Sequence, residues 1–448
     1  MRRALVLSLL VACGDDRPEI EELEPTSGSR LAIEQYQFDD GTRLVQPSAF
    51  YDRRIHARCT PQEWLDGVTR CVPDAEIAYY REDTCLTLFG VGNAIEHATH
   101  FLATDTRADG SQFWARAFEA DGRFDEPIGT GYVKRGSSCT AVGIPQLETT
   151  TYWNLGGEIG GEDLVPITER EIGEGRLGLA VRASDDGALV PLGFRDHDLG
   201  VACSPTPSGT CEPTEVPTSD VFAENTCTQP AILVGTDEPA PPLAGKRGSD
   251  GCRVFHTVES TQATRAFRDS SGGCTPVATG QRVLPLGAPV ELPQVTRTIG
   301  DAPKRRVQRI TVPLSLASGD VQVVTTRVFD TATRSECELR QAGDTLALRC
   351  LPTALAPIVR LFQPGCVVER RLAEVPAAAC EPFAFAMYDT GEMLEIHALG
   401  DPFDGTAYTI GSFGACTPYT ARAGTSLFHV GPLLPADTFV GAVAFGAR

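Results

Sequence analysis

The chain has 448 residues, of which 42% are hydrophobic, and its formal net charge at pH 7 is −20. This length allows several domains or one large repeat architecture. The acidic charge repels phosphate backbones, so we expect no nucleic-acid partner. The 44 glycines and 32 prolines exceed average usage and favour a turn-rich all-β chain over a helical one.

The first 13 residues resemble the signal of a bacterial lipoprotein. A short basic segment precedes an apolar stretch, residues 4–12, that is too short to span a bilayer. Leu10-Val11-Ala12-Cys13 then matches the lipobox. The resemblance implies lipidation of Cys13 and anchoring to the outer membrane, on its periplasmic or surface side. The alternative is an ordinary cleaved signal in which Cys13 is incidental.

Residues 14–28 are acidic, polar and Pro-containing, which predicts a flexible tether between the lipid and the body. The rest of the chain repeats itself three times, over residues 29–174, 175–304 and 305–448. In each copy an Asp precedes a Cys by seven residues, a second Cys has Pro two places on, and a Cys-Thr pair follows later. These matches are Asp52/Cys59, Cys71/Pro73 and Cys139-Thr140; Asp196/Cys203, Cys211/Pro213 and Cys274-Thr275; and Asp330/Cys337, Cys350/Pro352 and Cys416-Thr417.

The start of each repeat is also recognisable. Repeat one opens at Arg30-Leu31 and repeat two at Arg176-Leu177, and an Asp-Asp-Gly turn ends 11 residues after each Arg. Repeat three is looser, and we align its opening with Arg309-Ile310. Asp52, Asp196 and Asp330 follow the next strand. We interpret them as structural residues that cap a turn, the alternative being three equivalent ligands around an axis.

Each repeat contains two units of about four short strands, which in the first unit of repeat one lie near residues 31–38, 43–58, 67–71 and 76–82. Six four-stranded units arranged radially would form a six-bladed β-propeller, in which ring closure protects the sheet edges. We therefore predict an all-β fold, a six-bladed β-propeller built from three two-blade repeats. The alternative is three tandem β-domains, each with its own core.

The cysteines predict a disulfide-linked exported protein, because 14 of the 15 remain once Cys13 is lipidated. No two of them have the spacing of a zinc or thioredoxin-like motif, so we expect no metal at Cys. Short turns predict three bridges. The repeat pattern suggests two more, and one pair remains in repeat one. Cys274 and Cys416 are then left either to link repeats or to stay as free thiols. In that order the predicted pairs are Cys59–Cys71, Cys203–Cys211 and Cys337–Cys350; Cys227–Cys252 and Cys366–Cys380; and Cys85–Cys139.

Few residues suggest chemistry. His97 and His100 follow Glu96, but their order and spacing do not match the zincin motif. We therefore expect no catalytic residue, no cofactor and no metal site. Three tryptophans occur only in repeat one, where they indicate either a ligand site or core packing. They are Trp64, Trp114 and Trp153.

The repeat resembles that of uncharacterised cysteine-rich lipoproteins of the myxobacterial type. Arg70-Cys71-Val72-Pro73 and Arg349-Cys350-Leu351-Pro352 carry the match, and repeat two departs from it with Thr210 in place of Arg. The resemblance implies a location and no activity. We expect an exported, lipid-anchored envelope protein with a non-enzymatic binding or structural role, its protein or glycan ligand unknown. The alternatives are a glycan-directed hydrolase or lyase on the same scaffold, and a platform for a protein partner.

Overall fold

The structure is a computed structural model that describes residues 22–93, 99–106, 112–248, 252–270, 273–300, 302, 304–341, 347–376, 383–389, 394–411, 414–421 and 424–445. In these residues the chain is all-β, with two single-turn 3₁₀ helices, η1 (Gly161–Asp163) and η3 (Ala436–Thr438). No helix in this part of the chain is long and apolar enough to cross a membrane.

The first half of each repeat is an antiparallel meander of four strands. Turn residues separate the strands, and their apolar side chains point into shared cores, as alternation in a half-buried sheet requires. The strands are β1 (Leu31–Phe38), β2 (Arg43–Asp52), β3 (Ala57–Glu63) and β4 (Thr69–Pro73) in repeat one; β13 (Leu177–Ser184), β14 (Leu189–Asp196), β15 (Val201–Pro205) and β16 (Cys211–Pro213) in repeat two; and β26 (Val307–Ser315), β27 (Val321–Asp330), β28 (Ser335–Gln341) and β29 (Leu348–Pro352) in repeat three.

Strand register corrects the opening of repeat three. The first two strands pair Leu31 with Asp52, Leu177 with Asp196 and Val307 with Asp330. The Arg that opens repeat three is therefore Arg306, and our alignment on Arg309 is wrong by three residues. The reason is a longer hairpin, because 13 residues separate Arg306 from the turn glycine Gly319, against 11 in the other two repeats.

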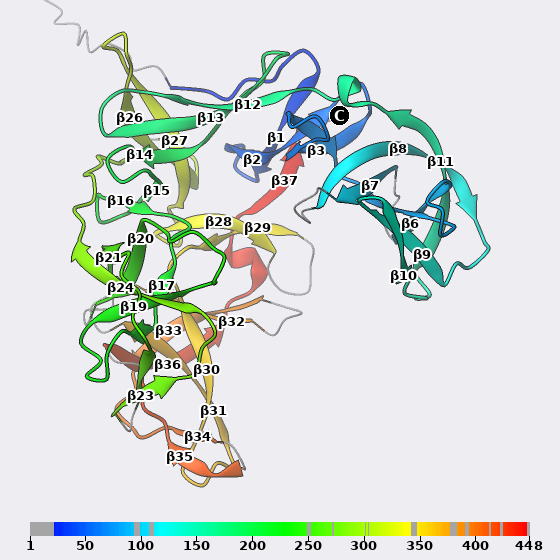
Figure 1. Ribbon diagram of the computed structural model, residues 1–448. Helices are drawn as coiled ribbons and strands as arrows, with labels where there is room; N and C mark the ends of the chain where they lie inside the picture. The colour runs from blue at the N-terminus through cyan, green and yellow to red at the C-terminus, as the bar shows by residue number, and fades with distance from the viewer. Residues whose placement is uncertain are drawn as a thin grey trace, which may run out of the picture.

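The three meanders form a closed ring. An extra strand pairs with the first strand of each meander: β12 (Ile167–Ile172) with β13, β25 (Thr298–Ile299) with β26, and β37 (Gly441–Phe445) with β1. A carbonyl shortly before each extra strand accepts a hydrogen bond from a backbone N–H of the last strand of the preceding meander. The N–H of Cys71 donates to Val165 at 2.9 Å, that of Cys211 to Pro293 at 2.9 Å and that of Cys350 to Val440 at 3.0 Å. The C-terminal strand thus closes repeat three onto repeat one, and Figure 1 shows it in red beside the blue β1. We call these meanders and extra strands the ring.

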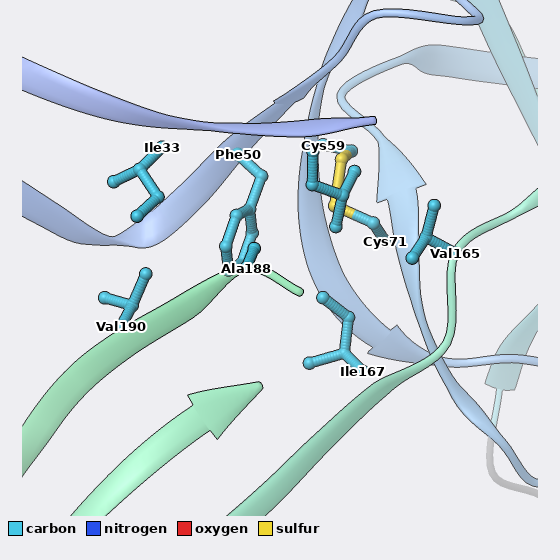
Figure 2. Close-up of a cluster of buried hydrophobic side chains, with 9 residues drawn as sticks. Ile33, Phe50, Cys59, Cys71, Val165, Ile167, Ala188 and Val190 are labelled. Atoms are coloured by element: carbon cyan, nitrogen blue, oxygen red, sulfur yellow. A yellow bond between two sulfur atoms is a disulfide. The ribbon is translucent and has the colours of Figure 1, made fainter. Parts of the chain in front are cut away.

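The cores of the ring lie between repeats. Figure 2 shows one of them, where Phe50 and the disulfide Cys59–Cys71 of repeat one face Ile167 of the extra strand β12 and Val190 of repeat two. Equivalent clusters join repeat two to three and repeat three to one. Among the described residues each of these three clusters joins two repeats, so the meanders are not separate domains.

The second half of each repeat forms a larger outer sheet that includes parallel pairs, such as β5–β7 and β30–β32. Figure 1 shows the outer sheet of repeat one standing apart from those of repeats two and three. The outer strands are β5 (Glu76–Tyr80), β6 (Leu88–Asn93), β7 (His100–Thr106), β8 (Gln112–Phe124), β9 (Thr130–Arg135), β10 (Ser138–Gly143) and β11 (Thr150–Ile159); β17 (Thr218–Ser219), β18 (Val221–Phe222), β19 (Pro230–Val234), β20 (Leu243–Arg247), β21 (Arg253–Val258), β22 (Ala266–Ser270), β23 (Gly273–Val277) and β24 (Arg282–Pro289); and β30 (Leu355–Phe362), β31 (Glu369–Pro376), β32 (Phe385–Asp389), β33 (Leu394–Pro402), β34 (Tyr408–Ile410), β35 (Cys416–Pro418) and β36 (Thr425–Leu433).

This topology confirms the all-β class and does not confirm a six-bladed propeller. The sheets contain 10, 7, 5, 8 and 7 strands, and the largest joins the meanders of repeats three and one through β37. Blades of a propeller are separate four-stranded sheets. Here the six units alternate between meanders joined into one ring and outer sheets nearly twice their size.

Candidate functional site

The Asp that recurs in each repeat is buried in an ion pair. Each carboxylate is at most 1% exposed, binds the Arg that opens its repeat and accepts the N–H two residues further on, as a turn-capping Asp does. Each guanidinium also donates to a carbonyl of the segment that leads, within the same repeat, to the extra strand on the next meander, so the pair ties the ring together. The pairs are Arg30–Asp52 at 2.5 Å, Arg176–Asp196 at 2.9 Å and Arg306–Asp330 at 2.7 Å; the carbonyls belong to Asp163, Glu291 and Thr438; and the N–H donors are Arg54, Asp198 and Ala332.

Six disulfides occur in the described residues, and they follow the threefold pattern. Three bridge the meanders and three bridge the outer sheets, and the first four below coincide with predicted pairs. They are Cys59–Cys71, Cys203–Cys211, Cys337–Cys350 and Cys85–Cys139, followed by Cys227–Cys274 and Cys366–Cys416.

The predicted pairs Cys227–Cys252 and Cys366–Cys380 are wrong. The β22–β23 hairpin brings the Cα of Cys274 to 5.7 Å from that of Cys227, and Cys416 occupies the equivalent place in repeat three. Cys274 and Cys416 are therefore neither free nor links between repeats. Cys252 is also disulfide-bonded, whereas Cys380 lies outside the described residues.

The aromatic and histidine candidates of repeat one do not form one site. Trp64 is 4% exposed in the core between the ring and the outer sheet. Trp153 belongs to another cluster, against Phe101. His100 is 4% exposed. Its Nδ1 lies 2.9 Å from the Thr99 hydroxyl, and its Nε2 has no hydrogen-bond partner among the described residues. Burial lowers the pKa of His100 below its ordinary value. His97 and the side chain of Trp114 lie outside the described residues, as does Cys13.

The main candidate site is a cavity of about 980 Å³ that residues of all three meanders line. Residues of β1, β2, β12, β13, β14, β15, β26, β27 and β28 line it, and we call it the central cavity. Residues 22–25, from the N-terminal side of the ring, complete its wall. A site of this size at the junction of several elements is where a ligand is ordinarily bound.

The N-terminal segment, residues 22–28, is held against the ring. Glu22 forms a parallel bridge with Val323 of β27, and Thr26 forms an antiparallel bridge with Leu189 of β14. Leu23 is half-buried against the core between repeats two and three. The prediction of a flexible tether over residues 14–28 is therefore wrong for residues 22–28. The backbone of this segment pairs with β27 and β14, and Leu23 contacts an apolar core. The composition of the segment alone predicts neither contact.

Comparison with known proteins adds a family. The family model designated DUF7481 matches residues 5–439, nearly the whole chain. The chain belongs to this family of unknown function. No curated protein and no solved structure matches the chain.

The central cavity of the DUF7481 chain is strongly charged and asymmetric. Repeat three supplies Arg309 and Arg327 at positions where strand register places apolar or small residues in the other repeats, Ile33 and Ala49 or Leu179 and Gly193. Five arginines and five glutamates line it. They are Arg43, Arg182, Arg195, Arg309 and Arg327, and Glu22, Glu24, Glu169, Glu215 and Glu338.

Behind this wall lies a buried acid. Glu336 is 10% exposed and forms an ion pair with Arg297, and Arg327 approaches it at 3.9 Å. Its Oε2 has no hydrogen-bond partner among the described residues. Identical residues therefore hold the three repeats in the ring, whereas charged residues that differ from repeat to repeat, Arg309 and Arg327 among them, line the cavity.

Proposed function

We propose that this DUF7481 protein is an exported lipoprotein of the bacterial envelope, anchored through Cys13, that binds a charged ligand in the central cavity without transforming it. The cavity supports the binding part of the proposal, because residues of all three repeats line it and two of its arginines, Arg309 and Arg327, break the repeat pattern. Six disulfides are typical of an extracellular or periplasmic protein. Leu10-Val11-Ala12-Cys13 supports lipidation.

Metabolic labelling tests the anchor. The full chain is expressed in a Gram-negative host fed an alkyne fatty acid, and the labelled proteins are separated from each cell fraction. We expect the wild-type chain to carry the label and to sediment with membranes, and Cys13→Ser to lose both properties. Val11→Ala, which keeps a small apolar residue in the lipobox, serves as the control and keeps the label. Labelled Cys13→Ser, or unlabelled wild type, would exclude the anchor.

A further inference from the structure

Arg309 marks a specific site within the central cavity. Strand register aligns it with Ile33 and Leu179, which are 2% and 0% exposed in the cores of their repeats. The side chain of Arg309 is 32% exposed, so it loses part of its hydration, and acidic partners offset that loss. Its partners come from outside the repeat.

Two glutamates of the N-terminal segment supply that compensation. Nη1 of Arg309 lies 3.0 Å from both carboxylate oxygens of Glu22 and 3.2 Å from Oε1 of Glu24. The hydroxyl of Thr325 on β27 also donates to Glu22. One guanidinium therefore recognises two carboxylates two residues apart, the spacing at which side chains of an extended chain point the same way.

The backbone of the segment is recognised as an added strand. The N–H of Leu23 donates to the carbonyl of Val323 at 2.9 Å. Thr26 and Leu189 exchange two hydrogen bonds, of 3.0 and 2.9 Å. Main-chain bonds to sheet positions give affinity for any extended chain, and the side-chain contacts select its sequence. The segment thus lies across β27 of repeat three and β14 of repeat two as a peptide ligand would.

We propose that this strip of the central cavity is a binding site for extended acidic peptides that carry carboxylates two residues apart, and that residues 22–26 occupy it in cis. The inference rests on the proposed binding function and names its ligand class. Because the segment is covalently attached, its effective concentration at the site is of millimolar order, so a free peptide competes poorly until the cis contacts are weakened.

Fluorescence anisotropy with a labelled peptide of residues 18–28 tests the site in the full-length protein. The double substitution Glu22→Gln/Glu24→Gln weakens the cis segment and leaves Arg309 intact. We expect this variant to bind the peptide at least ten-fold more tightly than the wild-type protein does. Adding Arg309→Leu, the residue that repeat two carries at this position, should reduce the affinity at least ten-fold, and Arg309→Lys should reduce it less.

Controls separate recognition from loss of structure. Each variant is used if its circular dichroism spectrum matches that of the wild type and its urea transition stays cooperative and lies above the urea-free assay conditions. A peptide with Gln at the positions of Glu22 and Glu24 should bind at least ten-fold more weakly. Undetectable binding to the double variant, equal binding to the Arg309→Leu variant, or equal binding of the Gln peptide would each overturn the inference. The labelling of Cys13 is a separate readout, so failure of the anchor and failure of the peptide site are distinguishable.

Discussion

At the scale of single residues, the same ion pair performs the same task three times. Each Asp has lost its hydration, and its compensation comes from a two-nitrogen contact with Arg and from a backbone N–H. Removing one partner of such a pair leaves the other uncompensated, which costs more than the pair contributes net. The role of the pair is therefore measured as the loss in the free energy of unfolding when one partner is removed.

Asp330→Ala tests this. Asp330 is 0% exposed, and its loss leaves the guanidinium of Arg306 and the N–H of Ala332 without their acceptor. We expect a loss of about 3 kcal/mol in the free energy of unfolding, measured by urea denaturation. Asp330→Asn, which keeps an acceptor, should lose less, and the exposed Asp320→Ala should lose under ~0.5 kcal/mol. Equal midpoints for Asp330→Ala and Asp320→Ala would contradict this role.

His100 predicts a pH dependence of stability. Burial lowers its pKa, and the carboxylates of Glu119 and Asp52 offset this only in part. Below pH 6.5, its ordinary pKa, the unfolded chain takes up a proton that the folded chain does not. The contribution of His100 is therefore fully present above that pH and falls as the pH is lowered.

His100→Gln isolates this effect. We expect the urea midpoint of the wild type to fall between pH 7 and pH 5 more steeply than that of His100→Gln. The exposed His429→Gln should behave as the wild type does. If His100→Gln and wild type show the same slope, the burial of His100 does not set the dependence.

At the scale of elements, local signals predicted what depends on short separations. The meander strands, their turn residues and the three short disulfides follow from spacings of about a dozen residues. Predictions failed where a hairpin changed length or a partner lay far along the chain. A local match aligns the opening of repeat three with Arg309. The β26–β27 hairpin is longer than its equivalents, and strand register places the opening at Arg306.

The longer disulfides show the same limit. Cys227 and Cys274 are 47 residues apart, and only the fold of the outer sheet brings them together. Cys85–Cys139 had the equivalent spacing, 54 residues. The outer sheets of all three repeats contain this bridge. Repeat one has one cysteine fewer than the other repeats, so its pair looks like an exception in the sequence. The ion pair between Arg309 and Glu22, 287 residues apart, had no local signal at all.

At the scale of the whole molecule, the C-terminal strand makes three repeats into one ring. β37 occupies for β1 the place that β12 and β25 occupy for their meanders, and it also pairs with β29. Both ends of the described part of the chain contact the ring. Residues 22–28 contact repeats two and three, and residues 441–445 pair with repeats three and one. A closed ring leaves fewer unpaired sheet edges than an open row of units does.

A matched pair of substitutions in β37 tests the closure. Ala442 is 7% exposed in the core between repeats three and one, whereas its neighbour Val443 is 65% exposed. Ala442→Asp buries an unpaired carboxylate and should lower the free energy of unfolding by about 3 kcal/mol, measured by urea denaturation. Val443→Asp should lower it by about 1 kcal/mol or less, because only strand propensity is lost at an exposed position. Similar losses for both would mean that the strand does not close the ring.

The sequence by itself determined the all-β class, the threefold repetition and the short-range disulfides, because each depends on composition or on residues close along the chain. Only the tertiary structure decided how the repeats are joined, which distant cysteines pair, and that residues 22–25 of the predicted tether line a charged cavity. Those features depend on pairings between residues tens to hundreds of positions apart. Many such pairings satisfy the same local pattern, and the packing of shared cores between repeats selects one of them.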